Sequence, residues 1–419
     1  MSVNQSLTIA EIDSTRLLSE IEELALISEA EPPAVTRIVF SAADMRARAW
    51  LIERCKAVGL AVRQDAVGNT FARWQGSDPT AQAVGTGSHI DAIPNAGKYD
   101  GVVGVLGGLE AIRALQRLGL RPQHSIELLL FTSEEPTRFG VGCLGSRLLS
   151  GVLSPEEARI LTDREGKPLE EVRRKAGLCG ELEEVRLPSG YYKAFLELHI
   201  EQGPVLEREQ VHLGVVTRIA APASGRLTVE GAGGHAGAVL MPDRRDALCA
   251  ASELILAIED TARTSGSIDT VATVGICEVF PGAVNSIPSR VHISVDVRDT
   301  DLVRRDAVMR AFEAAAQQIS ERRGVHILIG LLNADPPAEC APEIVEALSA
   351  ACRKHGYKFL SMISRAYHDS LFMSRIAPVG MLFIPCRNGY SHRPDEYTST
   401  EDIAQGTLIL AETLASLSV

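Results

Sequence analysis

The first half of the chain alternates segments with helical periodicity and short apolar runs of strand length. Residues 42–60 and 101–120 carry apolar side chains at the spacing of an amphipathic helix. Residues 83–90 and 125–133 are short and apolar, as expected of strands buried on both faces. Strands that alternate with helices form βαβ units, so this order predicts an α/β fold with a mixed or mostly parallel sheet flanked by helices.

The pattern changes from about residue 210. Alternating strands are expected at 225–233 and 290–300, and long helices at 243–262 and 301–324. We therefore expect an inserted α+β domain over residues 210–324. The last part of the chain returns to helix, strand and helix, so residues 1–209 and 325–419 should form one discontinuous domain. The more polar residues 151–190 are expected to be peripheral.

Composition argues against several classes of protein. The chain has 419 residues and a net charge of −12, which gives no positive field for a nucleic acid or an anionic membrane. No apolar run approaches the roughly 20 residues of a membrane-spanning helix. The acidic N-terminal segment is unlike a secretory signal, and the eight cysteines show no CxxC spacing. We therefore expect a cytoplasmic protein with reduced thiols.

Side chains that can bind metal ions end or follow the apolar runs. In an open α/β sheet, functional groups gather at the carboxyl ends of strands. Alone, each residue has an ordinary alternative: a helix N-cap for the aspartate, a solvated carboxylate for the glutamate and a structural role for each histidine. Together they predict a site for two divalent ions of Mn, Zn, Co or Ni. The five candidate ligands are His89, Asp100, Glu135, His199 and His392.

Two further acidic residues indicate catalysis. Asp91 lies two residues after His89 in an extended segment, so its carboxylate can orient that histidine. Glu134 and Glu135 are adjacent at a strand end and point in opposite directions, so one can bind a metal ion while the other faces substrate. Two divalent cations with Asp100, Glu135 and a hydroxide would keep about one positive charge, which suits polarisation of a carbonyl.

Four strings resemble the hydantoinase/carbamoylase branch of the M20 metallopeptidase-like amidohydrolases, over nearly the whole chain. The resemblance implies a metallopeptidase-like catalytic domain with two divalent metal ions per subunit, and a ferredoxin-like dimerisation or lid insert. It also implies that Glu135 binds the second ion and that Glu134 is the general base that takes a proton from the attacking water. The strings are GTGSHIDAIPNAGKYDG, ELLLFTSEEPTRFG, AFLELHIEQG and VGMLFIPCRNGYSHRPDEY.

The same resemblance assigns residues to the substrate. His235 would reach the active site of the partner subunit in a homodimer and stabilise the oxyanion. Arg298 and Asn285 would bind the substrate carboxylate, and Gln202 matches another substrate-contacting position. A surface ion pair with Asp296 is the alternative for Arg298.

The string SRAYHDSLFM departs from the carbamoylase pattern. Arg365 and Tyr367 replace small residues beside His368 and Asp369, so the pocket should differ. With FIPCRNGYSH, this string looks more like the ureidoglycolate amidohydrolases, and larger polar side chains suit a short hydroxylated ureido acid. His368 and Asp369 are then candidates for substrate binding, with a structural hydrogen-bonded pair as the alternative.

We therefore expect a dimeric two-metal amidohydrolase that cleaves a ureido or carbamoyl C–N bond in a small carboxylate, with release of ammonia and carbon dioxide. Ureidoglycolate is the first expected substrate. An N-carbamoyl-L-amino acid or allantoate amidohydrolase is the nearest alternative, followed by an aminoacylase or dipeptidase. Two other classes are an inactive metal-binding or solute-binding protein, and an NAD(P)-dependent oxidoreductase suggested by the GxGxxA spacing at Gly231.

Overall fold

The computed structural model describes residues 7–419 and divides into two compact units. Unit 1 contains the chain up to Thr217, Glu339–Ser364 and His368–Val419, and unit 2 contains Arg218–Ala338 and Arg365–Tyr367. The expected insert of residues 210–324 ends too early, because the strand β15 (His326–Ala334) pairs with β9 (Ala221–Glu230) and so belongs to unit 2.

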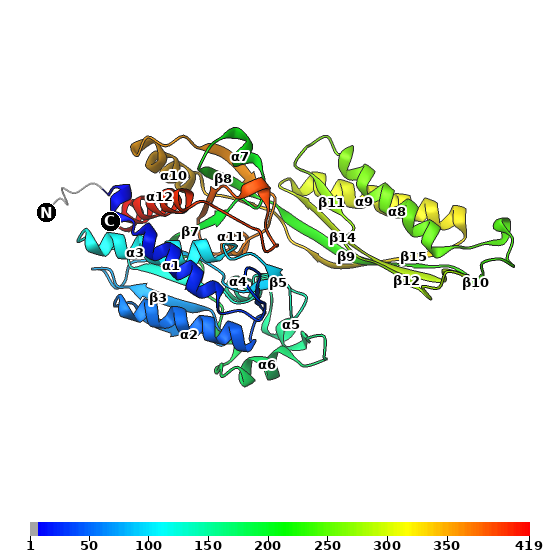
Figure 1. Cartoon of the computed structure of the whole chain (residues 1–419), viewed down its shortest axis with the longest axis horizontal. Coiled ribbons are helices and arrows are strands. Elements are labelled where there is room, and N and C mark those ends of the chain that lie inside the picture. Colours follow the sequence, from blue (N-terminus) through cyan, green and yellow to red (C-terminus); the bar gives the residue numbers. More distant parts are fainter. Residues whose placement is uncertain (1–6) are drawn as a thin grey trace. The chain divides into compact units, whose positions relative to one another are not determined.

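A mixed sheet forms the centre of unit 1 (Figure 1), with the order β16-β8-β18-β7-β4-β6-β3-β2 and with β17 paired to β8. The neighbours β18, β7, β4 and β6 run parallel. Every residue of β4, β6 and β18 is buried, as in strands covered on both faces. The strands are β2 (Ala61–Gln64), β3 (Thr70–Trp74), β4 (Ala83–Ser88), β6 (Ile126–Leu130), β7 (Tyr192–Ile200), β8 (Gly214–Ile219), β16 (Ala338–Glu339), β17 (Leu360–Ser364) and β18 (Val379–Ile384), besides the separate pair β1 (Val35–Arg37) and β5 (Ala92–Ala96).

Helices cover both faces of this sheet. Helices α3 and α12 pack on the central strands and on each other, with α1, α2 and α10 around the same apolar cluster. The other face is covered by α4, α11 and the segment 151–190, which was expected to be peripheral but contributes the buried Leu169, Val172 and Leu182. The helices are α1 (Ser14–Ala25), α2 (Ala42–Ala57), α3 (Val102–Arg117), α4 (Leu144–Ser150), α5 (Pro155–Ile160), α6 (Leu169–Lys175), α7 (Val205–Glu209), α10 (Pro342–Lys354), α11 (Asp369–Met373) and α12 (Thr400–Ser418).

Unit 2 is an antiparallel sheet with two helices on one face. Its order is β11-β14-β9-β15, with β12 also paired to β14. The chain order β9-α8-β11-β14-α9-β15 and this sheet order are those of a ferredoxin-like fold. The alternation expected over residues 290–300 is present in β14, where Val291, Ile293, Val295 and Val297 are buried against α8 and α9. The remaining elements are β10 (Gly234–His235), α8 (Ala247–Arg263), β11 (Val271–Thr273), β12 (Cys277–Phe280), β13 (Ser286–Ile287), β14 (Arg290–Asp299) and α9 (Leu302–Arg323).

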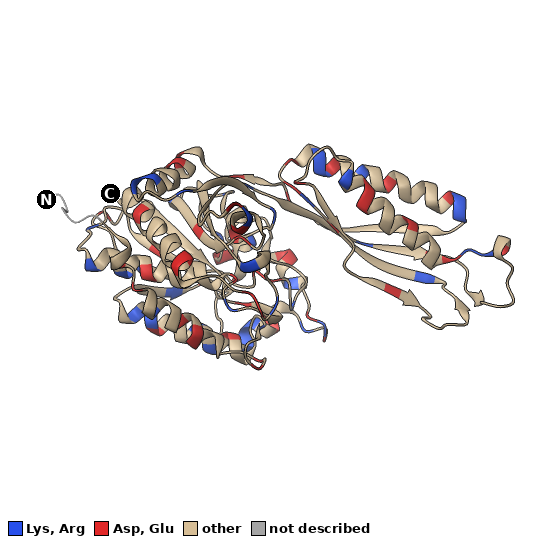
Figure 2. Ribbon diagram, turned by 45° about the horizontal axis from the view of Figure 1, so that its top comes forward, with Lys and Arg blue, Asp and Glu red and all other residues tan. Residues whose placement is uncertain are grey.

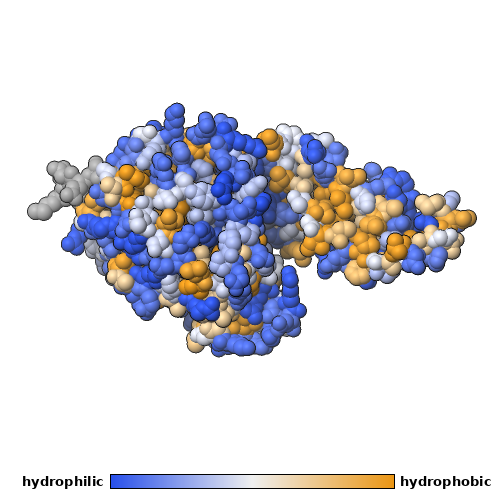
Figure 3. Space-filling model, in the orientation of Figure 1, coloured by the Kyte–Doolittle hydropathy of each residue, from blue (hydrophilic) through white to orange (hydrophobic). Residues whose placement is uncertain are grey.

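The surfaces of the two units differ in hydropathy. Acidic and basic residues are interspersed over both units (Figure 2). On the face seen in Figure 3, unit 1 is mainly hydrophilic, whereas hydrophobic residues gather over unit 2. Large exposed hydrophobic residues of unit 2 include Leu256, Leu328, Leu331 and Leu332. Within residues 7–419, no helix has the length and apolar character needed to cross a membrane.

Candidate metal centre

The predicted ligands of unit 1 gather at one edge of its sheet. Because β4, β6, β7 and β18 are parallel neighbours, their C-terminal ends lie at the same edge. His89 directly follows β4, Glu135 lies just after β6, His199 is the penultimate residue of β7, and His392 lies in the loop after β18. His89, His199 and Glu135 are buried, whereas the side chain of His392 is 45% exposed.

The carboxylate of Asp100, the residue before Gly101, lies close to all three histidines. Its Oδ1 lies 3.5 Å from His89 Nε2 and 3.3 Å from His199 Nε2, and its Oδ2 lies 3.4 Å from His392 Nε2. Asp100 is not the N-cap of α3, because that position is Gly101. Gly101 has φ +67°, and a Cβ there would lie 2.5 Å from the His89 ring, so this close approach requires glycine.

The donor atoms form two groups that share Asp100. The first ligand group is His89, Asp100 and His199, and the second is Asp100, Glu135 and His392. Within each group the donor atoms all lie within 4.8 Å of one another. Ligands at about 2.1 Å from a tetrahedral cation are about 3.4 Å apart. The separations of 3.2–3.5 Å between histidine Nε2 and carboxylate oxygens therefore suit a divalent ion in each group.

Hydrogen bonds of the Nδ1 atoms of two histidines are consistent with metal binding through Nε2. His89 Nδ1 lies 3.0 Å from the carbonyl oxygen of Asp91, and His199 Nδ1 lies 2.9 Å from that of Ile200. A ring nitrogen that donates to a carbonyl carries the proton, so Nε2 keeps its lone pair for a metal ion. The backbone N–H of Gly101 donates to His199 Nε2 at 3.1 Å, in agreement with this tautomer.

The electrostatics of the cluster favour added positive charge. Burial raises the pKa of Glu134 well above its usual range; His89 opposes the shift, and Glu135 adds to it. Hydrogen bonds with Asp100 and Glu135 raise the pKa of His392 to about 11. Both shifts arise because carboxylates are crowded in a buried site, where divalent cations would stabilise their charged forms.

Asp91 acts differently from the sequence-based prediction. Its carboxylate is 3.7 Å from His89 Nδ1, and its backbone carbonyl, not its side chain, makes the closer contact. The carboxylate instead accepts the backbone N–H groups of Glu134 at 3.2 Å and Glu135 at 3.0 Å. Glu134 Oε2 lies 3.7 Å from His89 Nε2, yet Glu134 belongs to neither ligand group. Asp91 therefore fixes the strand end that carries both glutamates.

His368 and Asp369 are both buried, with exposures of 1% and 0%. The His368 ring centroid is 4.5 Å from that of His199, and its Nε2 lies 3.0 Å from Ser364 Oγ. Asp369 accepts a hydrogen bond from Ser146 Oγ at 2.5 Å. These buried contacts favour the alternative of a structural role over direct contact with substrate.

A third possible ligand group, Glu197 with His199 and His368, uses a histidine that already belongs to the first ligand group. Glu197 accepts hydrogen bonds from Ser88 Oγ and from both the backbone N–H and the hydroxyl of Ser370. Its oxygens are therefore engaged, and the two groups that share Asp100 form the better site.

Two residues beside Asp100, Ser391 and Glu396, were not among the residues predicted from the sequence. Ser391 Oγ lies 2.5 Å from Asp100 Oδ2, and the Gln202 side-chain amide donates to the same oxygen at 2.7 Å. Glu396 accepts the backbone N–H of Asp100 at 3.1 Å. The only signal for either residue was proximity to His392 in the string YSHRPDEY.

Two of the predicted substrate residues in unit 2 are neighbours. His235 pairs with Ser286 in the short β10–β13 ladder, and the N–H of Ala236 donates to the carbonyl of Asn285 at 2.9 Å. His235 is exposed and lies five residues beyond the end of β9 at Glu230. His235 and Asn285 therefore belong to the same end of unit 2.

Arg298 lies at the opposite end of that sheet. It pairs with Pro222 at the start of β9, whereas Arg290 pairs with Glu230 at its end. Its Nε donates to Asp296 Oδ1 at 2.6 Å, so the expected ion pair is present, and its guanidinium lies 5.4 Å from the centroid of the Tyr367 ring.

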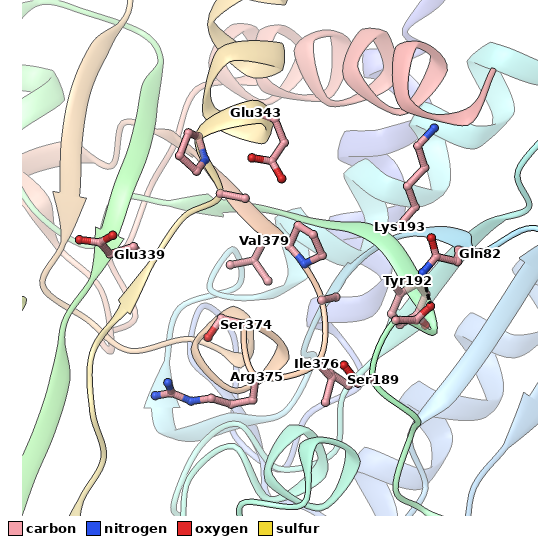
Figure 4. Close-up of a pocket in the computed structure, with 15 residues that line it drawn as sticks. Gln82, Ser189, Tyr192, Lys193, Glu339, Glu343, Ser374, Arg375, Ile376 and Val379 are labelled. Carbon is pink, nitrogen blue, oxygen red and sulfur yellow. Dashed lines mark hydrogen bonds between the residues drawn. The ribbon is translucent and has the colours of Figure 1, made fainter.

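A pocket of about 540 Å³ lies at the other edge of the unit 1 sheet (Figure 4). Gln82, Tyr192 and Val379, which line it, stand at the beginnings of β4, β7 and β18, whereas the ligands follow the ends of these strands. None of the predicted site residues lines this pocket, so the metal centre is the better candidate for the active site.

Comparison with known proteins identifies the family. The model of Peptidase family M20/M25/M40 matches residues 85–416, which include all five candidate ligands. The chain belongs to this family. Its members are metal-dependent hydrolases, and the two ligand groups provide suitable residues for metal ions.

Within the M20/M25/M40 family, the chain is similar to amidohydrolases. A ureidoglycolate hydrolase of Oryza sativa subsp. japonica is 52% identical, covering 97% of this chain and 85% of the relative. An N-carbamoyl-L-amino acid amidohydrolase of Geobacillus stearothermophilus is 38% identical, covering 97% and 99%. A solved structure of AtUAH in complex with (S)-hydroxyglycine superposes with a TM-score of 0.92 at 50% identity and covers both chains fully. These relatives act on C–N bonds other than peptide bonds.

Proposed function

We propose that this protein is a two-metal amidohydrolase that hydrolyses the ureido group of ureidoglycolate. One observation carries the proposal: Asp100 is shared by two ligand groups, while Glu134 lies beside them and belongs to neither. The relatives named ureidoglycolate hydrolase, at 52% and 50% identity, support the substrate. So does the (S)-hydroxyglycine bound to AtUAH, because hydroxyglycine remains when ureidoglycolate loses ammonia and carbon dioxide.

The two ligand groups would each hold one divalent ion of Mn, Zn, Co or Ni. When bound, the ions supply Lewis-acid polarisation of the ureido carbonyl and lower the pKa of water. Glu134 takes a proton from the water that attacks the ureido carbon and delivers it to the leaving nitrogen, which departs as ammonia. The carbamic acid that remains loses carbon dioxide, and its proton stays on the nitrogen of the hydroxyglycine product. Asp91 keeps Glu134 and Glu135 in register by accepting both backbone N–H groups.

Arg298 would bind the substrate carboxylate. Its guanidinium is oriented by Asp296 and by the Tyr367 ring, and a planar guanidinium can make two parallel hydrogen bonds to a carboxylate. Gln202 would contact the substrate from beside Asp100. We assign structural roles to His368 and Asp369, because both are buried and the His368 ring packs against that of His199.

We further propose a homodimer in which His235 and Asn285 of the partner subunit complete each active site. Eight residues of extended chain separate Arg290 from Arg298, or about 26 Å at about 3.3 Å per residue. A small ureido acid cannot span that length, so Arg298 and His235 of one copy cannot hold the same molecule. Asn285 lies with His235, so it would reach the carboxylate that Arg298 binds from the partner subunit. The exposed hydrophobic residues of unit 2 (Figure 3) suit a subunit interface.

We place the protein in the cytoplasm on the basis of its cysteines. All eight are free thiols, and Cys179, Cys249 and Cys277 are exposed. Exposed free thiols persist in a reducing compartment.

A substrate panel tests the proposed function. Ammonia release would be measured with ureidoglycolate, allantoate and an N-carbamoyl-L-amino acid after reconstitution with each metal ion, with a dipeptide as the control. We expect kcat/KM for ureidoglycolate to exceed the others by at least about tenfold, which is about 1.4 kcal/mol of discrimination. Preference for the carbamoyl amino acid would favour the alternative represented by the 38% identical relative. Cleavage of the dipeptide without ammonia from any ureido compound would overturn the proposal.

A further inference from the structure

Glu396 lies in the loop between β18 and α12 and is 4% exposed. Its Oε1 accepts the backbone N–H groups of Tyr99 at 2.8 Å and Asp100 at 3.1 Å. Its Oε2 lies 2.8 Å from the hydroxyl of Ser391. One buried side chain thus ties the segment before α3 to a loop almost 300 residues later in the sequence. Burial of a carboxyl group is unfavourable unless its oxygens are hydrogen-bonded. The contacts of Glu396 meet that requirement and indicate a specific structural role for its side chain.

The structural role of Glu396 is to position Asp100, the residue shared by the two ligand groups. Ser391, which Glu396 holds, also contacts Asp100 Oδ2 at 2.5 Å. Glu396 therefore acts on Asp100 twice, directly at its backbone and through Ser391 at its carboxylate. Ser391 precedes His392, so the same contact fixes the loop that carries a histidine of the second ligand group.

The loop needs such a restraint. His392 has φ +59°, a left-handed conformation that residues other than glycine rarely adopt, and its side chain is 45% exposed. Such a conformation persists only where surrounding contacts hold it. The first ligand group, in contrast, draws His89 and His199 from the ends of buried strands.

The glycine at position 97 provides room for Glu396. A Cβ built on Gly97 would lie 2.4 Å from Glu396 Cβ and 2.5 Å from its Oε1. The chain before Asp100 therefore passes against Glu396 at a distance that any larger residue would prevent.

We propose that Glu396 is a positioning residue that assembles the second ligand group by holding Asp100 and the Ser391–His392 loop together. The inference rests on the proposed two-metal function. Loss of a residue that supports metal ligands typically weakens metal binding by about 10- to 100-fold. The larger effect should fall on the second ion, because Glu396 holds both Asp100 and the loop of His392 in that group, whereas in the first ligand group it holds Asp100 alone.

Glu396→Gln is the variant that can keep the hydrogen bonds of Glu396. The Ser391 hydroxyl has one hydrogen and two carboxyl neighbours, Asp100 and Glu396, so it can donate to only one of them. In Glu396→Gln, the amide oxygen can accept both backbone N–H groups and the amide nitrogen can donate to Ser391. Ser391 is then free to donate to Asp100. Glutamine should therefore preserve the arrangement, whereas leucine in Glu396→Leu offers none of these contacts.

The experiment compares metal content and affinity in the full chain. Wild type, Glu396→Leu and Glu396→Gln would be reconstituted with Mn or Zn and titrated against a chelator, with metal per chain measured by mass spectrometry. We expect two ions in wild type and in Glu396→Gln. In Glu396→Leu we expect the second ion to bind about 10- to 100-fold more weakly, with a smaller loss for the first ion because the two ligand groups share Asp100. Gly97→Ala should shift the second affinity in the same direction without altering any ligand.

Asp65→Leu is the matched control. Asp65 also accepts two backbone N–H groups, those of Val67 and Asn69, but it contacts no predicted ligand. This variant should be less stable to urea and still bind two ions with wild-type affinity. The inference would be overturned if Glu396→Leu bound each ion with its wild-type affinity. It would also be overturned if the Leu and Gln variants lost metal affinity equally. Fewer than two ions in wild type would instead refute the two-metal function itself.

Discussion

The proposed exchange of residues between subunits predicts that two impaired variants restore each other. His235→Ala removes a donor to the developing oxyanion, a change that typically costs about 10²- to 10³-fold in kcat. Arg298→Ala removes a charge-assisted contact to the substrate carboxylate, worth about 1.5–3 kcal/mol, or about 10- to 100-fold in kcat/KM. At low substrate concentration each homodimer should therefore retain about a tenth of wild-type activity or less.

Restoration is expected because His235 and Arg298 lie at opposite ends of the sheet of unit 2. In a heterodimer, the subunit that carries His235→Ala has its own Arg298 and receives the intact His235 of the partner subunit, so one site is complete. The other site lacks both residues. Free exchange at equal concentration gives about half heterodimers, and hence about a quarter of wild-type activity. Heterodimers purified through two different tags should reach about half.

The assay is ammonia release from ureidoglycolate by co-expressed subunits, with dimer formation followed by gel filtration. Mixing His235→Ala with Asn285→Ala is the matched control, because both residues lie at the same end of unit 2 and no site in that heterodimer is complete. Activity of the His235→Ala and Arg298→Ala heterodimer no higher than the mean of its two parents would refute the reasoning.

Three further predictions concern the metal centre itself. Glu134→Gln should lower kcat by about 10²- to 10⁴-fold while metal content stays at the wild-type level; near-normal turnover would remove Glu134 as the base. Asp91→Ala leaves two buried N–H groups unpaired, those of Glu134 and Glu135, so urea unfolding should show a loss of about 1–3 kcal/mol for each. Metal binding at pH 7 should release protons, because Asp100 and Glu135 raise the pKa of His392 to about 11 in the metal-free protein and a ligand histidine must be neutral. Calorimetry in two buffers of different ionisation enthalpy measures that release, and identical heats in both would contradict it.

The fold could be predicted where one segment contains its own signal. The alternation in β14 placed Val291 to Val297 in the core, and helical periodicity located α2, α3, α8 and α9 within a few residues. The strand β15 was missed because HILIGLLNA is apolar on both sides and follows a long helix. Its place is set by pairing with β9, about a hundred residues earlier, which no local pattern encodes.

The same distinction between local and distant signals applies to the residues of the metal centre. His89, Asp100 and Glu135 could be proposed because metal-binding residue types stand at the ends of strands, and the structure brings these side chains together. The target of the Asp91 carboxylate could not be foreseen, since it depends on how the end of β6 meets the segment after β4. Glu396 gave no signal for the same reason: its partners are backbone atoms of a distant segment.

The sharing of Asp100 leaves the two cation positions chemically unequal. The first is bounded by two imidazoles and the shared carboxylate, the second by one imidazole, the shared carboxylate and Glu135. Imidazole ligands suit zinc, nickel and copper, whereas carboxylates suit manganese and magnesium. Under the proposed two-metal function, the two ligand groups would favour different elements, and activity after reconstitution should depend on which element is supplied first.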